Sequence, residues 1–186
     1  VLNKGKPTPL PDGVLLIDEA YGHGTHIAGT IAAINPMAMI ASYRVMNSDG
    51  VGSAYNVAKA IFVAMAEGAD VINLSLSIDG NSDLVAMALA SAVNSGIDVY
   101  SSVGNTSAQG VLFPASLTAE NSPVPLKSMF PYAVVSVAAV DEADLKAPFS
   151  AWGSLVDVTA PGTNIYAALP NGNYGWWSGT SMATAV

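Results

Sequence analysis

The spacing of apolar positions changes several times along this chain, and the changes mark predicted helices and strands. In some stretches apolar residues recur every three or four positions, as on one face of a helix. These helical stretches are residues 22–34, 53–67 and 82–95. Short runs of consecutive apolar residues, typical of buried strands, separate and follow them. The predicted strands are residues 39–46, 70–76, 97–103, 132–140, 156–159 and 165–169. This order predicts an α/β fold of three layers, in which helices flank a mostly parallel β-sheet.

Glycine and proline indicate where these elements end. Gly68 and Gly96 follow two of the helical stretches in the position of a helix C-cap, and Pro36 closes the first one. Residues 1–20 contain three prolines and little periodicity, so we expect an irregular N-terminal arm. Residues 106–131 contain four prolines and are predicted to form a loop longer than most connections between elements.

Composition narrows the class of protein. Of the 186 residues, 51% are hydrophobic and 11% are charged, which predicts one domain over residues 1–186 with a large core. The net charge of −8, with only six Lys and Arg, argues against nucleic acid or an anionic membrane surface as a partner. No apolar run reaches the roughly 18 residues of a membrane span, and no signal peptide opens the chain. There are no cysteines, so disulfides and thiolate zinc sites are excluded.

Ser181 is the candidate nucleophile. It follows Gly179, which permits a tight turn, and with Thr180 it favours the cap of a helix expected from Met182 onward. A helix start favours the negative charge that develops when a serine oxygen attacks a carbonyl. A plain helix cap explains the same residues, because a serine acts as a nucleophile only with a base, an orienting group and oxyanion donors nearby.

The two histidines of the chain are the candidate bases. His23 and His26 lie one turn apart at the start of the first helical stretch. The residues alone leave three interpretations open: one of them is the base for Ser181, both are packed or surface histidines, or they form a zinc pair that lacks further His or Cys ligands. Asn105 follows the predicted strand 97–103, at the end of a strand where active residues of parallel sheets gather.

Together these motifs resemble the subtilisin-like serine proteases (peptidase S8, the subtilases), from about Tyr21 to the last residue. The matching segments are Gly-His-Gly-Thr-His-Ile-Ala-Gly-Thr at 22–30, Val-Ile-Asn-Leu-Ser-Leu at 71–76, Gly-Asn at 104–105, Ala-Pro-Gly at 160–162 and Gly-Thr-Ser-Met-Ala at 179–183. The resemblance implies a serine endopeptidase that works through an acyl-enzyme. Ser181 would be the nucleophile, His23 the general base and Asn105 an oxyanion donor beside the Ser181 N–H, with His26 as a structural neighbour.

The resemblance also implies where a substrate lies. An extended polypeptide would lie between two segments, which are Gly50, Val51 and Gly52 on one side and Ser75, Leu76 and Ser77 on the other. A first side-chain pocket would have its floor at Ser102, Val103 and Gly104. Ser77 stands where the family commonly has Gly, and Val103 where it has Ala, so both are expected to narrow this pocket.

The chain departs from the family pattern most clearly before His23. The family's orienting Asp has no counterpart there, because Asp12 and Asp18 are too close to the histidine. We therefore expect an internal fragment, incomplete at both ends, with the catalytic Asp outside this chain, and we expect the isolated chain to be inactive. The alternative is a catalytically inactive subtilase-like binding or scaffold module.

The remaining expectations concern cofactors, partners and location. The chemistry requires no cofactor. The family often carries structural calcium, for which Asp79 and Asn81 are candidates only, so the metal ligands are unknown. Expected partners are polypeptide substrates and a propeptide or inhibitor of the parent enzyme. The resemblance implies a secreted or extracytoplasmic protein.

Overall fold

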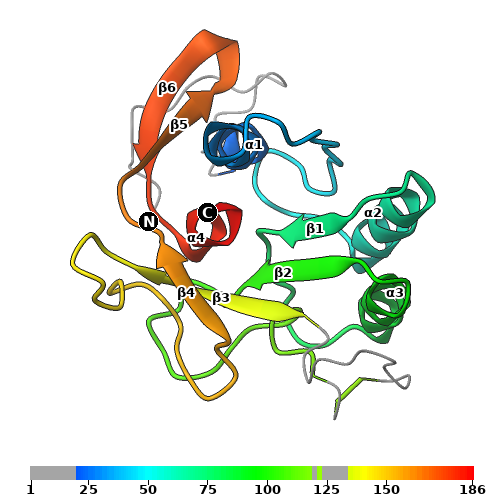
Figure 1. Cartoon of the computed structure of the whole chain (residues 1–186). Coiled ribbons are helices and arrows are strands. Elements are labelled where there is room, and N and C mark those ends of the chain that lie inside the picture. The colour runs from blue at the N-terminus through cyan, green and yellow to red at the C-terminus, as the bar shows by residue number, and fades with distance from the viewer. Residues whose placement is uncertain (1–19, 119–120, 123–133) are drawn as a thin grey trace.

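A parallel β-sheet forms the centre of the molecule (Figure 1). The computed structural model describes residues 20–118, 121–122 and 134–186. The sheet has the strand order β1-β2-β3-β4, and each neighbouring pair is parallel. Its strands are β1 (Val71–Leu74), β2 (Asp98–Ser102), β3 (Val135–Val140) and β4 (Val158–Pro161). The predicted α/β class with a mostly parallel sheet is therefore confirmed.

Helices cover the two faces of this sheet. On one side α2 (Ala54–Ala66) and α3 (Asp83–Asn94) pack against each other (Figure 1). Their apolar faces form the main core, in which Val85 and Leu89 are fully buried. On the other side α4 (Thr180–Ala185) packs against all four strands, and α1 (His23–Ile34) packs against α4. The sheet thus lies between two helical layers.

Serine caps explain where α2 and α3 begin. The Ser53 hydroxyl accepts a hydrogen bond from the N–H of Asn56 (3.2 Å), and Ser82 accepts one from the N–H of Val85 (3.4 Å). Each side chain thereby satisfies one of the N–H groups that the first turn of a helix leaves without a partner. The predicted helices 53–67 and 82–95 are confirmed with shifts of one residue at each end.

An antiparallel hairpin lies beside α1 and leads into α4. It consists of β5 (Ile165–Leu169) and β6 (Asn173–Trp177), joined by the short 3₁₀ turn η1 (Pro170–Gly172). The hairpin packs on α1, and Gly29 permits the close approach, because a Cβ there would lie 3.0 Å from the backbone nitrogen of Ala168. Residue 177 is followed after two residues by α4, so the hairpin fixes the start of the helix that carries Ser181.

The prediction of a strand at 39–46 is wrong. Within the described residues this segment forms only an isolated antiparallel bridge between Met46 and Gly52, and Met39 is 99% exposed. The sheet order places β1 at an edge, where Val71 is 55% exposed, and the segment does not pair with it. An apolar run becomes a strand only where a neighbouring strand accepts its N–H and C=O groups.

The start of α4 differs from the prediction by two residues. Helix α4 begins at Thr180 and not at Met182, so Ser181 lies inside the first turn and Gly179 occupies the N-cap position. The expected irregular arm at 1–20 lies, apart from Ala20, outside the described residues, as do residues 119–120 and 123–131 of the expected loop and the first two residues of the predicted strand 132–140.

Candidate active site

Glycine contacts at the end of β6 position Ser181. The N–H of Gly179 donates to the carbonyl of Gly162 (2.8 Å). A Cβ on Gly162 would lie 2.5 Å from the Cβ of Ala139 and 2.9 Å from the carbonyl oxygen of Gly179, so only glycine fits between β3 and the start of α4. The Ala-Pro-Gly motif at 160–162 therefore brings the segment before Ser181 onto the sheet.

Ser75 contacts the nucleophile candidate from the carboxyl end of β1. Its hydroxyl donates to the backbone carbonyl of Ser181 (2.8 Å) and accepts a hydrogen bond from Nδ2 of Asn73 (3.0 Å). The Ser181 hydroxyl in turn donates to the carbonyl of Ser75 over a long 3.4 Å. Ser181 is half-buried, and within the described residues its Oγ makes only this weak bond. The hydroxyl can therefore turn toward a base or a substrate at little cost.

The side chain of Asn105 is fixed by the first turn of α4. Its amide oxygen accepts hydrogen bonds from both the N–H and the hydroxyl of Thr180, each 2.9 Å long. With the oxygen engaged, the amide nitrogen is the donor that remains, and it lies 3.4 Å from where a Cβ on Gly179 would stand. Asn105 is solvent-exposed. The amide thus offers an oriented N–H₂ donor on the side of the chain that leads to Ser181.

Gly104 makes this placement of Asn105 possible, which leads to a prediction. Its φ is +104°, and a Cβ there would lie 2.5 Å from Cδ1 of Leu112. Gly104→Ala is therefore expected to destabilise the fold by about 1–3 kcal/mol and to lower kcat by displacing Asn105. Chemical denaturation and steady-state kinetics measure the two effects.

Gly110 supplies the matched control for that change. It also has a positive φ, +120°, but no atom lies within 4 Å of an added Cβ. Gly110→Ala should show the backbone strain alone and leave kcat unchanged. Equal losses of kcat in the two variants would contradict the role given to the Gly104 contact.

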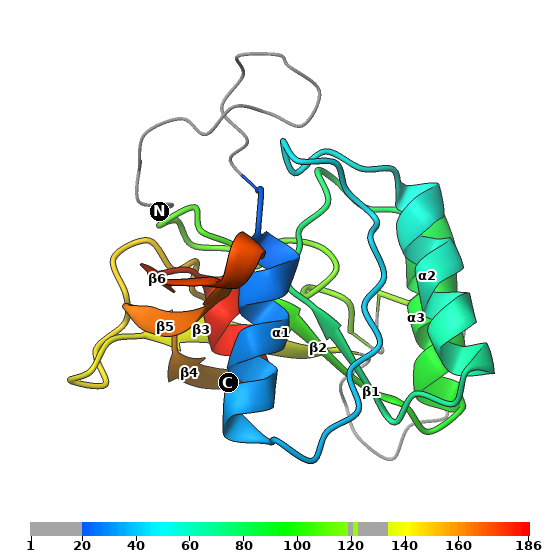
Figure 2. The same cartoon turned by 90° about the horizontal axis from the view of Figure 1, so that it is seen from above.

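His23 begins α1 at the same end of the molecule at which α4 begins. Figure 2 shows both helices starting at this end, and they pack against each other. Gly22 precedes the helix with φ +86°, and its close contact with Pro170 leaves no room for a Cβ. The imidazole is half-buried, and its ring stacks on Trp177 at a centroid distance of 6.2 Å. Burial lowers the pKa of His23, and a positive charge on His26 lowers it further.

His26 is fully buried against the hairpin. Its Nε2 lies 3.1 Å from the carbonyl oxygen of Ile165 and 3.3 Å from that of Gly175, so Nε2 must carry the hydrogen. Its Nδ1 has no hydrogen-bond partner among the described residues. Burial lowers the pKa of His26, while the bonds to the two carbonyls act in the opposite direction. The ring thus links α1 to β5 and β6.

The two segments expected to hold a substrate border one groove. Five of the six residues, all but Ser75, line a depression of about 250 Å³. Its wall is mainly apolar and includes Met46, Val57 and Ile78, and Asp79 also lines it. Because Ser75 contacts Ser181 and residues 76–79 line the groove, the groove begins next to the nucleophile candidate.

The expected floor of the first pocket lies at the end of β2. Ser102 and Val103 are buried, and the side chain of Val103 packs in a cluster with Ala115, Ala138 and Ala151. The expectation that Val103 and Ser77 narrow this pocket stays a prediction.

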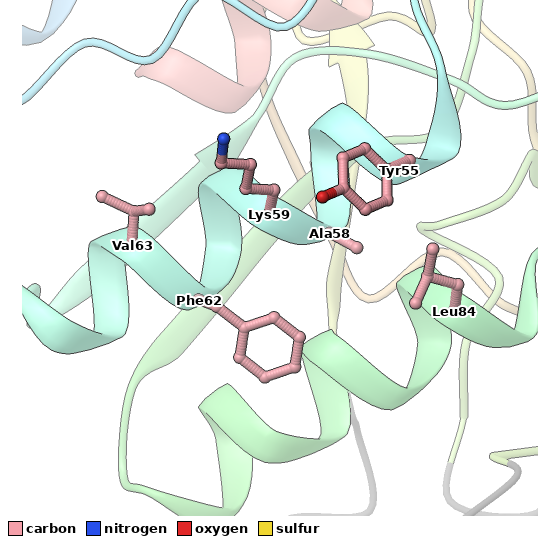
Figure 3. A pocket seen from close by; sticks show the side chains of 6 residues that line it. All are labelled: Tyr55, Ala58, Lys59, Phe62, Val63 and Leu84. Atoms are coloured by element: carbon pink, nitrogen blue, oxygen red, sulfur yellow. The ribbon is translucent and has the colours of Figure 1, made fainter.

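A second depression lies apart from these residues, between α2 and α3. Figure 3 shows Tyr55, Phe62 and Leu84 around it, with Lys59 on the same helix as Tyr55 and Phe62. Its lining includes none of the motif residues at Ser181, His23 or Asn105, so it is separate from the candidate site.

Comparison with known proteins identifies the family of this chain. The sequence pattern of the subtilase family, Peptidase S8, matches residues 10–186. The chain belongs to the subtilase family. A thermostable alkaline protease of Halalkalibacterium halodurans is 36% identical over 172 residues, covering 88% of this chain and 44% of the relative. Subtilisin of Bacillus pumilus is 34% identical over 190 aligned positions, covering 97% of this chain and 66% of the relative.

A solved structure of a subtilisin-like proteinase has the same fold as this subtilase. The crystal structure of a cold adapted subtilisin-like serine proteinase superposes with a TM-score of 0.76 at 30% identity, covering 94% of this chain and 61% of the other. The chain spans about half the length of several curated relatives that it matches. The predicted membership of the subtilase family is thus confirmed.

Sequence reasoning missed two residues that contact the candidate site. Trp177, which contacts both histidine rings, carries no pattern in the sequence that points to such a role. Thr180 is part of the serine motif, but its two hydrogen bonds to Asn105 join residues 75 positions apart and cannot be inferred from spacing. Both contacts depend on the tertiary fold.

Metal and membrane features can be stated for the described residues only. Within residues 20–118, 121–122 and 134–186, no three His, Cys, Asp or Glu side chains are grouped closely enough to hold a metal ion. Asp79 lines the groove, and Asn81 is exposed. None of the described helices is long and apolar enough to cross a bilayer.

Proposed function

We propose that the full-length protein containing this chain is a serine endopeptidase. The observation that carries the proposal is a unit at the start of α4, in which the amide oxygen of Asn105 is hydrogen-bonded to Thr180, the neighbour of Ser181. The amide nitrogen remains as a donor, and within the described residues the Ser181 hydroxyl makes only one long hydrogen bond, to the carbonyl of Ser75. A helix cap alone would need no such donor. The same unit lies next to a groove suited to an extended chain.

In the proposed mechanism His23 takes the proton of the Ser181 hydroxyl as Oγ attacks the carbonyl carbon of a peptide bond. Of the two histidines, His26 has its Nε2 engaged by backbone carbonyls, which leaves His23 for this role. The oxyanion accepts hydrogen bonds from the Asn105 amide and from the Ser181 N–H, which has no acceptor within the first helical turn. The imidazolium then protonates the leaving amine, and water hydrolyses the acyl-enzyme by the reverse sequence.

We further propose that an aspartate outside this chain orients His23. Within the part of the chain that the structure describes, the imidazole of His23 makes a ring contact with Trp177 but no hydrogen bond or ion pair. A base that must become charged in the transition state benefits from an acidic partner, which fixes the tautomer and stabilises the imidazolium.

The pH dependence of hydrolysis tests this mechanism. His23 acts as a base only when neutral, so kcat/KM should fall as the pH falls through its pKa. The groups of this chain hold that pKa below the ordinary value of about 6.5, whereas a carboxylate in contact would raise it. With the proposed aspartate we expect the acid limb of this profile to lie at higher pH than in a variant whose aspartate is replaced by asparagine.

Two other outcomes would count against the proposal. An acid limb that does not move to lower pH in that variant would mean that no carboxylate acts on His23. Absence of hydrolysis by a folded full-length protein would favour the inactive binding or scaffold module. His23→Ala, which removes the base, is the control that separates hydrolysis by this site from a contaminating peptidase.

The substrates proposed are polypeptides bound in extended form in the groove. Main-chain pairing with Gly50–Gly52 and Ser75–Ser77 would read the peptide backbone, and the apolar wall would accept an apolar side chain. A propeptide or inhibitor partner, structural calcium and an extracytoplasmic location stay proposals that follow from the family.

A further inference from the structure

Trp177 lies on the inner face of the hairpin, between the two histidines and α4. Successive residues of a strand point to opposite faces, and here Trp176 is 60% exposed while Trp177 is half-buried. Trp176 pairs across the hairpin with Tyr166 on the outer face, and these two rings contact each other at 4.8 Å. The indole of Trp177 instead faces α1.

The indole contacts both imidazoles. It is nearly parallel to His26, with an interplanar angle of 7° and a centroid distance of 5.1 Å. It stacks on His23 at 29° and 6.2 Å. It also packs against the cluster of Ile27, Met182 and Ala185 from α1 and α4. The indole is therefore held by both helices, and its position is linked to that of the helix carrying Ser181.

We propose that Trp177 is a positioning residue for His23, which holds the plane of the imidazole and stabilises its protonated form through the indole face. This inference rests on the proposed role of His23 as general base. A cation over an aromatic face is attracted by the ring quadrupole, and Trp is the strongest such partner. The stabilisation would be greatest in the transition state, when His23 has taken the proton of Ser181.

Among the described residues of α1, the hairpin and α4, no carboxylate is available to stabilise the protonated form of His23, so the indole is the group proposed to do so. Residues 158–186, which contain β4, β5, β6 and α4, include no Asp, Glu, Lys or Arg. Tyr166 and Tyr174 lie on the outer face of the hairpin with Trp176. On α1 the titratable neighbour is His26, whose positive form would lower the pKa of His23. The remaining group is the aspartate proposed to lie outside this chain, which would act together with the indole.

The test compares Trp177→Leu and Trp177→Phe in the full-length protein. Leucine fills part of the space without an aromatic face, whereas phenylalanine keeps a weaker face. We expect Trp177→Leu to lower kcat by about 3- to 30-fold with KM unchanged, and Trp177→Phe to lower it less. The pKa of His23, followed by NMR with His23→Gln to assign its signal, should fall in Trp177→Leu.

Trp176→Leu is the matched control, since it removes the neighbouring indole from the outer face and should change neither kcat nor the His23 pKa. The proposal is overturned if Trp177→Leu leaves the His23 pKa unchanged, if its effect is confined to KM, or if leucine and phenylalanine behave alike. The NMR titration needs no catalysis. If the wild-type protein does not hydrolyse peptides, the proposed function fails while the titration still decides whether the indole acts on His23.

Discussion

Ser181→Ala in the full-length protein is expected to lower kcat by about 10⁶-fold, which is the size of the loss known for the same change in subtilisin. The hydroxyl would form the covalent acyl-enzyme, and no neighbouring group replaces it: Ser75, the nearest serine in the hydrogen-bond network, points its hydroxyl at the Ser181 carbonyl. Alanine keeps the helix and its contacts. The folded state should therefore be nearly unchanged, and steady-state hydrolysis of a peptide substrate measures the loss.

Ser75→Ala is the control for the chemistry of Ser181. It removes one hydrogen bond to the Ser181 carbonyl and leaves the nucleophile in place. A bond of this kind contributes about 0.5–1.5 kcal/mol, so we expect about a 2- to 10-fold change in kcat at most. A Ser181→Ala variant that retains activity similar to Ser75→Ala would contradict the role of Ser181 as nucleophile.

Substitutions of Asn105 are expected to affect kcat and the free energy of unfolding by different amounts, because the oxygen and the nitrogen of its amide have different partners. The oxygen accepts two hydrogen bonds from Thr180, and the nitrogen is the proposed oxyanion donor. Asn105→Asp keeps an acceptor for Thr180 but removes the donor, whereas Asn105→Ala removes both. Both variants should lower kcat by about 10²- to 10³-fold or more, again the size known for the oxyanion asparagine of subtilisin.

The stability of the two variants should differ. Asn105→Ala loses both bonds to Thr180 and is expected to lower the free energy of unfolding by about 1–3 kcal/mol, whereas Asn105→Asp should lose less. Urea denaturation and kinetics on one peptide substrate measure the two properties. An effect on KM with kcat unchanged would show that Asn105 binds the substrate and not the oxyanion.

Much of the fold could be predicted because local rules and tertiary structure agree there. Helices α2 and α3 have apolar faces at helical spacing and serine caps that satisfy their first N–H groups. The strands β1, β2 and β3 are short apolar runs that pair in parallel as expected. In these elements the sequence period and the burial pattern carry the same information.

The segment 39–46 shows where this reasoning fails. Its apolar run matches a strand, but pairing is a property of two segments, and within the described residues no strand pairs with it beyond the bridge at Met46. The exposure of Met39 follows from the missing neighbour. No count of apolar residues within one segment can reveal this.

The motifs of the candidate site could be recognised in the sequence, whereas the contacts between them could not. The serine, histidine and Gly-Asn motifs are local in sequence, and resemblance to the subtilases gave each a role. The partners of His26 are the backbone carbonyls of residues 165 and 175. Any residue at these positions would provide such a carbonyl, so the sequence does not identify them. The indole of Trp177 likewise meets the histidines only through the folding of the hairpin onto α1.

Labelling of the full-length protein with a fluorophosphonate probe tests the central claim most directly. The probe reacts with a serine only when a base and an oxyanion site activate it. We predict a single modification on Ser181, located by mass spectrometry, that is lost in His23→Ala and slowed in both Asn105 variants. Labelling that does not depend on His23, or a folded protein that is not labelled at Ser181, would contradict the account.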